Sequence, residues 1–77
     1  MSELGDKIRK IRGEAGLSVI QLAEKVGLTR SAIYLYESGD RAPSIDIADK
    51  IVKACGADIN ALRKLYTPTL YYDKKVK

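Results

Sequence analysis

The sequence predicts a compact all-α domain of five short helices, and three observations lead to this prediction. Apolar residues recur every three to four positions, the spacing of helices rather than of strands. Serine, threonine, aspartate and glycine stand where such helices would begin and end. The two prolines, Pro43 and Pro68, lie outside the apolar stripes. A chain of 77 residues supports one domain with a modest core.

The first two predicted helices lie on either side of Gly16. Apolar residues at i, i+4, i+7 and i+11 share one face of the first helix, which Gly16 ends. Ser18 begins the second helix, Gln21 completes a capping-box pattern, and Gly27 ends the helix. We expect the buried apolar residues of these two helices to be Leu4, Ile8, Ile11, Ala15, Leu22, Ala23 and Val26.

The third predicted helix follows Thr29, a residue type that favours the N-cap position. It spans about residues 30–37 and directs Ile33 and Tyr36 toward the core. The segment Ser38-Gly39-Asp40 predicts a turn after this helix.

Two further helices are predicted before Pro68. Ser44 begins the fourth, which Gly56 closes, and Asp58 begins a short fifth. Their inward residues are expected to be Ile47, Ile51, Cys55, Ile59, Leu62 and Leu65. Residues 1–66 thus form the predicted domain, and 67–77 form a tail that is rich in tyrosine and then basic.

The composition argues against an enzyme or a metal protein. The chain has no histidine and one cysteine, so it lacks the groups of a metal site or a histidine-based catalytic site, and we expect no cofactor. The net charge of +4 favours polyanionic partners only mildly. No apolar run could span a membrane and the first residues do not resemble a signal peptide, so we expect a cytoplasmic location.

The second and third predicted helices form a helix-turn-helix pattern, Leu22-Ala23-x-x-x-Gly27-Leu28-Thr29-x-x-x-Ile33-x-x-Tyr36. Ala23 is small enough for a close helix crossing, and Gly27 can adopt the positive φ of a short turn. The hydroxyl of Thr29 and the neighbouring amides can bind a phosphate. A plain hairpin of two helices is the alternative interpretation.

The chain resembles the phage repressor and Cro-like helix-turn-helix family, also called the XRE family. The resemblance covers about residues 4–65. It rests on Ile8-x-x-Ile11-Arg12, Gly16-Leu17-Ser18, residues 21–27, Ser31-Ala32-Ile33-x-x-x-Glu37-x-Gly39, Pro43-Ser44 and Gly56-Ala57-Asp58-Ile59-x-x-Leu62. It implies a lambda-repressor-like domain of four or five helices that binds an operator, commonly as a dimer.

The resemblance also implies roles for particular residues. The start of the second helix, Ser18 and Val19, would approach a phosphate through backbone amides, and Thr29 would begin the recognition helix. Arg30 and Ser31 would face base edges, and Tyr34 and Leu35 would lie further along the groove. After the helix, Ser38 and Arg41 would meet the opposing DNA backbone. Arg12 would pair with Glu37 and orient the helix.

Two residues depart from the family pattern. Val19 stands where the family often has glutamine, so only its amide can contribute. Leu35 stands where arginine or glutamine commonly reads bases; a leucine can contact a thymine methyl but donates no hydrogen bond. Both departures weaken sequence-specific readout and leave the phosphate contacts in place.

Several residues have two interpretations. Tyr34 is either a DNA contact or an exposed tyrosine, while Tyr36 and Cys55 are interpreted as core residues. The basic residues between positions 7 and 12 are interleaved with acidic ones and are read as a solvated face. The tail is either a frayed terminus or an interface, and the expected dimer contacts are Arg63, Tyr66, Leu70, Tyr71 and Tyr72.

The sequence therefore predicts a transcriptional regulator, in the form of a repressor, that binds double-stranded DNA as a homodimer on a near-palindromic operator. The alternative is a module that keeps the fold and binds a partner protein, as an antitoxin binds its toxin. Val19, Leu35 and the exposed tyrosines favour that alternative.

Overall fold

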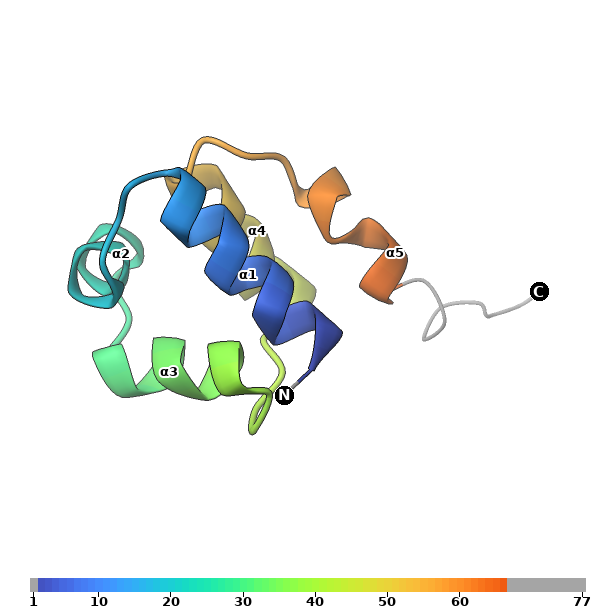
Figure 1. The fold of residues 1–77 in the computed structure, drawn as a ribbon, viewed down its shortest axis with the longest axis horizontal. Helices are drawn as coiled ribbons and strands as arrows, with labels where there is room; N and C mark the ends of the chain where they lie inside the picture. Colours follow the sequence, from blue (N-terminus) through green and yellow to red (C-terminus); the bar gives the residue numbers. More distant parts are fainter. Residues whose placement is uncertain (1, 67–77) are drawn as a thin grey trace.

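The computed structural model describes residues 2–66, and every regular element in that part of the chain is helical. Figure 1 shows α1 lying across the middle of the domain, with α2 and α3 on one side of it and α4 behind it. The elements are α1 (Glu3–Glu14), α2 (Val19–Val26), α3 (Arg30–Ser38), α4 (Ile45–Ala54), the 3-10 helix η1 (Ile59–Ala61) and α5 (Arg63–Tyr66). The predicted all-α fold is confirmed.

Side-chain caps fix where the helices begin. The predicted caps Ser18, Thr29, Ser44 and Asp58 each accept a hydrogen bond from a backbone amide two or three residues later. A further cap, Ser2, was not predicted; its Oγ accepts from the Gly5 amide at 2.9 Å, and α1 begins at Glu3.

Two helix ends differ from the prediction. Ser38 was expected in a turn but is the last residue of α3, because Gly39 adopts φ 89° and ends the helix there. The fifth helix is divided into η1 and the short α5, with Leu62 between them. Asp58 caps η1 by accepting from the Asn60 amide at 2.9 Å. A turn at Leu62 then separates η1 from α5.

The core is built from the inner faces of α1, α2, α3 and α4, and Leu62 adds to it from the segment between η1 and α5. The predicted residues Ile8, Leu22, Ile33, Ile51 and Leu62 are fully buried. The core also contains three residues that the prediction did not place there, which are Val19, Ala48 and Val52.

The predicted inner face of α4 is therefore shifted. Ile47 and Cys55 were expected to share the buried stripe with Ile51, but both are only half-buried. Ala48 and Val52, one position further along, occupy the centre of that face. A small residue at position 48 fits a tight helix contact better than isoleucine does, so it faces inward. Partial burial raises the pKa of the Cys55 thiol above its ordinary value.

Gly5 permits a close approach between the start of α1 and the end of α3. A Cβ at this position would lie 2.4 Å from the Glu37 carbonyl oxygen and 2.7 Å from that of Tyr36. No side chain fits there without displacing the backbone. This contact, with the capping of α1 by Ser2, places α1 directly against the end of α3.

No helix in residues 2–66 is long and apolar enough to cross a membrane. The same residues contain no cluster of three or more side chains that could hold a metal ion.

Candidate nucleic-acid interface

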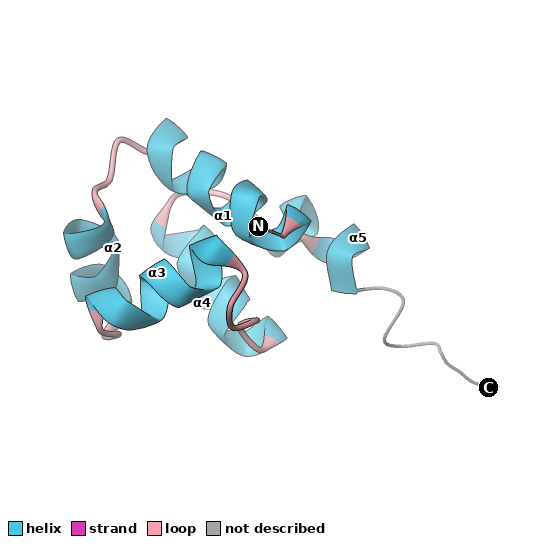
Figure 2. Cartoon of the chain, turned by 60° about the horizontal axis from the view of Figure 1, so that its bottom comes forward, coloured by secondary structure: helices cyan, strands magenta, loops and turns pink. Residues whose placement is uncertain are grey.

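The helix-turn-helix consists of α2, a short turn and α3, which meet at one corner of the domain (Figure 2). Gly27 adopts φ 72° and ends α2 as predicted, with its amide donating to the Ala23 carbonyl. The Leu28 amide donates to the same carbonyl at 3.0 Å. Ala23 is buried between the helices, and Ile33 and Tyr36 anchor α3 in the core. These features fix α3 with its opposite face toward solvent.

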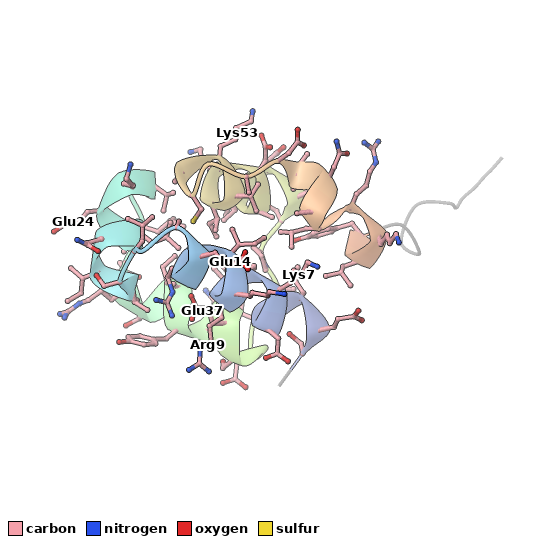
Figure 3. All side chains as sticks on the ribbon, turned by 45° about the horizontal axis from the view of Figure 1, so that its top comes forward. Lys7, Arg9, Glu14, Glu24, Glu37 and Lys53 are labelled. Atoms are coloured by element: carbon pink, nitrogen blue, oxygen red, sulfur yellow. The ribbon has the colours of Figure 1, made fainter. Side chains whose placement is uncertain are left out.

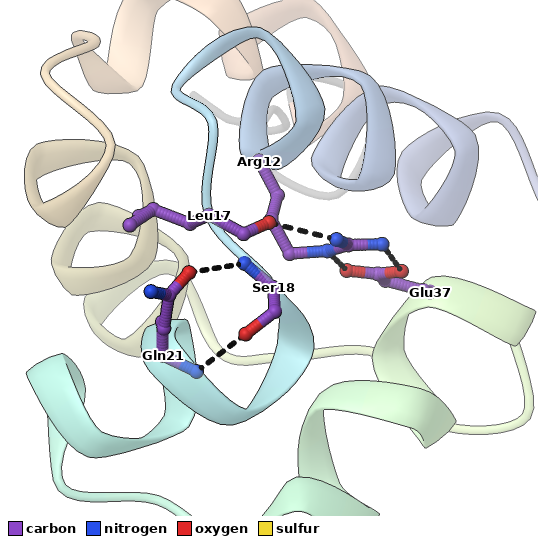
Figure 4. A network of polar contacts seen from close by, with 5 residues as sticks. All are labelled: Arg12, Leu17, Ser18, Gln21 and Glu37. Atoms are coloured by element: carbon purple, nitrogen blue, oxygen red, sulfur yellow. Dashed lines mark hydrogen bonds and ion pairs between the residues drawn. The ribbon is translucent and has the colours of Figure 1, made fainter.

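Arg12 joins the three segments that determine the position of α3 (Figure 4). Its Nε and Nη2 donate to the two carboxylate oxygens of Glu37 at 2.6 and 3.0 Å. Its Nη1 donates to the Leu17 carbonyl at 2.9 Å, immediately before the start of α2. The ion pair expected between Arg12 and Glu37 is therefore present, and the contact to Leu17 was not predicted.

This ion pair is well shielded from water. The side chains of Arg12 and Glu37 are 17% and 8% exposed. The hydrogen bond to Glu37 raises the pKa of the Arg12 guanidinium above its ordinary value, against the opposing effect of burial. The guanidinium therefore stays charged, and its planar fork holds the carboxylate in a fixed orientation.

At the start of α2, the Ser18 amide that was expected to approach a phosphate already has a hydrogen-bond partner. That amide donates to Gln21 Oε1 at 2.9 Å, and Ser18 Oγ accepts from the Gln21 amide at 3.0 Å (Figure 4). The reciprocal pair is the predicted capping box, and it occupies the Ser18 amide. The amides of Val19 and Ile20 donate to no residue in the described part of the chain, so they remain available to an anion.

The start of α3 offers a second set of amides. Thr29 Oγ1 accepts from the Ala32 amide at 3.1 Å, which leaves the threonine hydroxyl proton available as a donor. The amides of Arg30 and Ser31 begin the helix, and both side chains are exposed. An anion at this helix start would meet N–H donors and the positive end of the helix dipole.

The outer face of α3 carries four of the side chains expected to meet DNA. Arg30, Ser31 and Tyr34 are exposed, with 60% of Tyr34 accessible, while Leu35 is half-buried. Positions 30, 31, 34 and 35 share one helical face, opposite the buried Ile33 and Tyr36. The structure thus brings these four side chains together on one solvent-facing surface.

The segment after α3 is more constrained than expected. Ser38 Oγ lies 3.1 Å from both the Leu35 carbonyl and Asp40 Oδ2, so its hydroxyl closes the end of the helix. Arg41 is exposed, and its amide donates to the Leu35 carbonyl at 3.2 Å. The Ser38 hydroxyl is thus engaged within its own turn, whereas Arg41 is exposed.

Val19 does not offer a side chain to any partner. It is 8% exposed and belongs to the core, which corrects its interpretation as a surface residue that could bind another protein. The exposed apolar residue at the start of α2 is the next one, Ile20, which is 48% accessible. The capping box could have revealed this, because a helix that begins at Ser18 directs only one of the two neighbouring apolar residues inward.

The predicted dimer contacts are only partly covered by the structure. Arg63 and Tyr66 lie in α5, beside a groove between α4 and α5. Tyr66 is half-buried, and its hydroxyl donates to the Pro43 carbonyl at 3.0 Å. Leu70, Tyr71 and Tyr72 lie outside the described residues.

A helix-turn-helix family model matches residues 8–62, which contain the whole of α2, α3 and α4. The chain belongs to the helix-turn-helix family of the XRE type. This confirms the resemblance to phage repressors and Cro-like proteins, and it makes the domain a member of a family of DNA-binding transcriptional regulators.

Similar proteins from other organisms support the same family assignment. An HTH-type transcriptional regulator of Methanothermobacter thermautotrophicus is 43% identical over 51 residues, which are 66% of this chain and 74% of that protein. An HTH-type transcriptional regulatory protein of Pyrobaculum aerophilum is 39% identical over 61 residues, 79% of this chain and 24% of the relative. The chain likewise spans 18% and 17% of similar regulators from Sulfurisphaera tokodaii and Picrophilus torridus, so it matches only a part of these longer proteins.

Two solved structures share the fold. One is the biofilm master regulator SinR in complex with DNA, with a TM-score of 0.72 and 30% identity over 78% of this chain and 97% of that one. The other is a complex of SinR with SinI, with a TM-score of 0.73 and 28% identity over 90% of this chain and 68% of that one.

Proposed function

We propose that this chain represses transcription by occupying DNA, with α3 in the major groove. The observation that carries the proposal is the single outer face of α3, where Arg30, Ser31 and Tyr34 project away from a rigid scaffold. An α-helix with such a face fits the major groove, and repression by occupancy needs no further domain. The likeness to SinR in complex with DNA supports this proposal.

Base readout in this proposal depends mainly on Arg30. An exposed arginine at the start of α3 can donate two hydrogen bonds to a guanine, a contact that discriminates by about 1–3 kcal/mol. Ser31 can bond to either base edge, and Leu35 can contact a thymine methyl. The free amides of Val19 and Ile20, the Thr29 hydroxyl and the Arg41 side chain would hold the phosphates on the two sides of the groove.

The proposed active form is a homodimer that places two α3 helices about one DNA turn apart on a near-palindromic site. Arg63 and Tyr66, together with Leu70, Tyr71 and Tyr72, are the proposed dimer contacts. We further propose that residues 1–66 form the DNA-binding domain and that residues 67–77 serve this dimerisation.

Selection of bound sequences from a random DNA pool tests this proposal. The wild-type protein should select a site with two-fold symmetry, and Arg30→Ala should select a site that is relaxed at one or two base pairs in each half. Lys64→Ala, which removes an exposed cation from α5, is the matched control and should select the wild-type site. An unchanged preference for Arg30→Ala would contradict the proposed position of α3 on DNA.

A second candidate function is binding to a partner protein. It is favoured by the accessible apolar side chains of the helix-turn-helix, which are Ile20 on α2 and Tyr34 and the half-buried Leu35 on α3. The structure of SinR with SinI shows a related fold in complex with another protein. A gel shift with random-sequence DNA at low salt separates the two functions, since absence of any shift at micromolar protein would favour the partner-binding function.

A further inference from the structure

A groove between α1 and α3 borders the proposed DNA-binding face. It is lined by Asp6, Arg9, Arg12, Tyr34, Glu37 and Ser38. The two helices pack directly against each other, and Figure 3 shows Arg9 and Glu37 at the same edge of the molecule. A side chain in this groove therefore lies beside the helix that we propose to enter the major groove.

Among the charged residues of this groove, Arg9 is the cation without a partner in the described part of the chain. The Arg12 guanidinium uses Nε and Nη2 on Glu37 and Nη1 on Leu17. Arg9 is exposed, and it forms no ion pair or hydrogen bond with residues 2–66. Asp6 lines the same groove but lies beyond ion-pairing distance of Arg9.

Tyr34 places a hydroxyl donor in the same groove. The side chain is 60% exposed, and its hydroxyl forms no hydrogen bond within residues 2–66. Arginine and tyrosine together supply a planar cationic fork and a neutral O–H donor, and both groups bind phosphate oxygens. The Ser38 hydroxyl contributes less, because it already bonds within its own turn.

The dimensions of DNA place a phosphate backbone near this groove. The major groove is about 12 Å wide, and an α-helix with its side chains is about 10–12 Å across. A helix in the groove fills it, so a neighbouring helix lies over one of the walls, which are phosphate backbones. Because α1 packs against the end of α3, it is the helix that would lie over one of these walls in the proposed complex.

We propose that the α1–α3 groove is a binding site for a DNA backbone phosphodiester, held by Arg9 with the Tyr34 hydroxyl. This inference rests on the proposed function and adds a contact from outside the helix-turn-helix. The contact would contribute affinity and no base preference. It also gives the exposed Tyr34 a role in holding the backbone.

Salt-dependent binding to a DNA duplex tests this site with a matched pair of variants. Arg9→Ala and Lys7→Ala each remove one exposed positive charge from α1, so they change the net charge equally. The two positions point in directions roughly 160° apart on the helix, and Lys7 does not line the groove. Arg9→Ala should lower the slope of log K against log salt by about 0.9, the value for one phosphate contact. Lys7→Ala should leave the slope at the wild-type value.

Two further variants sharpen the result. Arg9→Lys keeps the charge and should restore most of the slope, and Tyr34→Phe should weaken binding to all sequences by the same factor. Thermal unfolding checks that each variant is folded. Equal slopes for Arg9→Ala and Lys7→Ala would overturn this inference while wild-type binding upholds the proposed function. A wild-type protein that binds no DNA would overturn the proposed function as well.

Discussion

Arg12 holds together three segments whose relative positions determine where α3 points. Arg12 is part of α1. Its side chain donates to the Leu17 carbonyl, just before α2, and to the Glu37 carboxylate near the end of α3. A lysine has no planar fork and cannot make all of these contacts at once. The ion pair is therefore a structural element of the proposed interface, although it does not lie on the outer face of α3.

Arg12→Ala should lower the free energy of unfolding by about 3 kcal/mol, because it leaves the Glu37 carboxylate, which is 8% exposed, without its partner. Urea unfolding measures this loss. The double variant Arg12→Ala with Glu37→Ala should be more stable than the sum of the two single variants implies. Strict additivity would show that the pair contributes nothing specific.

Gly5 is the second residue whose role depends on a contact rather than on helix propensity. Gly5→Ala should destabilise the domain by about 1–3 kcal/mol, because its Cβ would lie 2.4 Å from the Glu37 carbonyl oxygen. Gly13→Ala is the matched control, since it lies in the same helix with no atom within 4 Å of the new Cβ. That variant should be more stable than wild type by about 0.5–1 kcal/mol.

Chemical unfolding of Gly5→Ala and Gly13→Ala checks these opposite signs. Stabilisation by both substitutions would mean that α1 and α3 do not approach as closely as the structure indicates.

At the scale of elements, α5 is held to the rest of the domain through Tyr66. The hydroxyl donates to the Pro43 carbonyl at 3.0 Å, across the segment that joins α3 to α4. A helix of four residues has no stability of its own, so its position depends on contacts of this kind. Arg63 and Tyr66 line the groove between α4 and α5, so the shape of that groove depends on the position of α5.

Tyr66 predicts a pH dependence of stability. Partial burial raises the pKa of its phenol above the ordinary value of 10.0, so the folded state disfavours the phenolate. The contribution is complete below the ordinary pKa and is lost as pH rises through the higher pKa of the folded state. The free energy of unfolding of the wild type should thus fall more steeply above about pH 10 than that of Tyr66→Phe.

Urea unfolding at a series of alkaline pH values compares the two proteins, which share every other titrating residue. Parallel curves would contradict a specific role for the phenol.

The starts of most helices could be predicted from the sequence, whereas the exact inner face of α4 could not. Caps and apolar spacing predicted the starts of α2, α3 and α4, because these are local interactions that the sequence records within four residues. On α4, Ile51 was predicted correctly, but Ala48 and Val52 are buried where Ile47 and Cys55 were expected, since which neighbouring residue turns inward depends on the helices that α4 meets.

At the scale of the whole molecule, the contacts of the candidate site join residues far apart in the sequence, and most of them could not be predicted from local patterns. The Arg12–Glu37 pair could be predicted only through the family pattern, because its residues are 25 positions apart. The close approach at Gly5 and the α1–α3 groove could be recognised only from the three-dimensional arrangement of α1 and α3. The local signal was a glycine in the first turns of α1, one turn before Ile8, since glycine is unfavourable inside a helix unless space requires it.

Three exposed arginines lie around α3, at positions that suit contacts to the phosphates of a duplex. Arg30 stands at the start of this helix, Arg41 follows its end, and Arg9 lies beside it on α1. A protein that contacts several phosphates in this way loses affinity steeply as salt rises, because each contact releases a condensed counterion.

The central claim is that this domain binds DNA through the face of α3, and an equilibrium titration with a fluorescent random-sequence duplex tests it most directly. Anisotropy should report binding at micromolar protein in low salt, with affinity that falls steeply as salt is raised. Arg30→Ala should weaken this binding, while Lys64→Ala on α5 should have little effect. Absence of binding at micromolar protein, or an affinity that does not depend on salt, would contradict the claim.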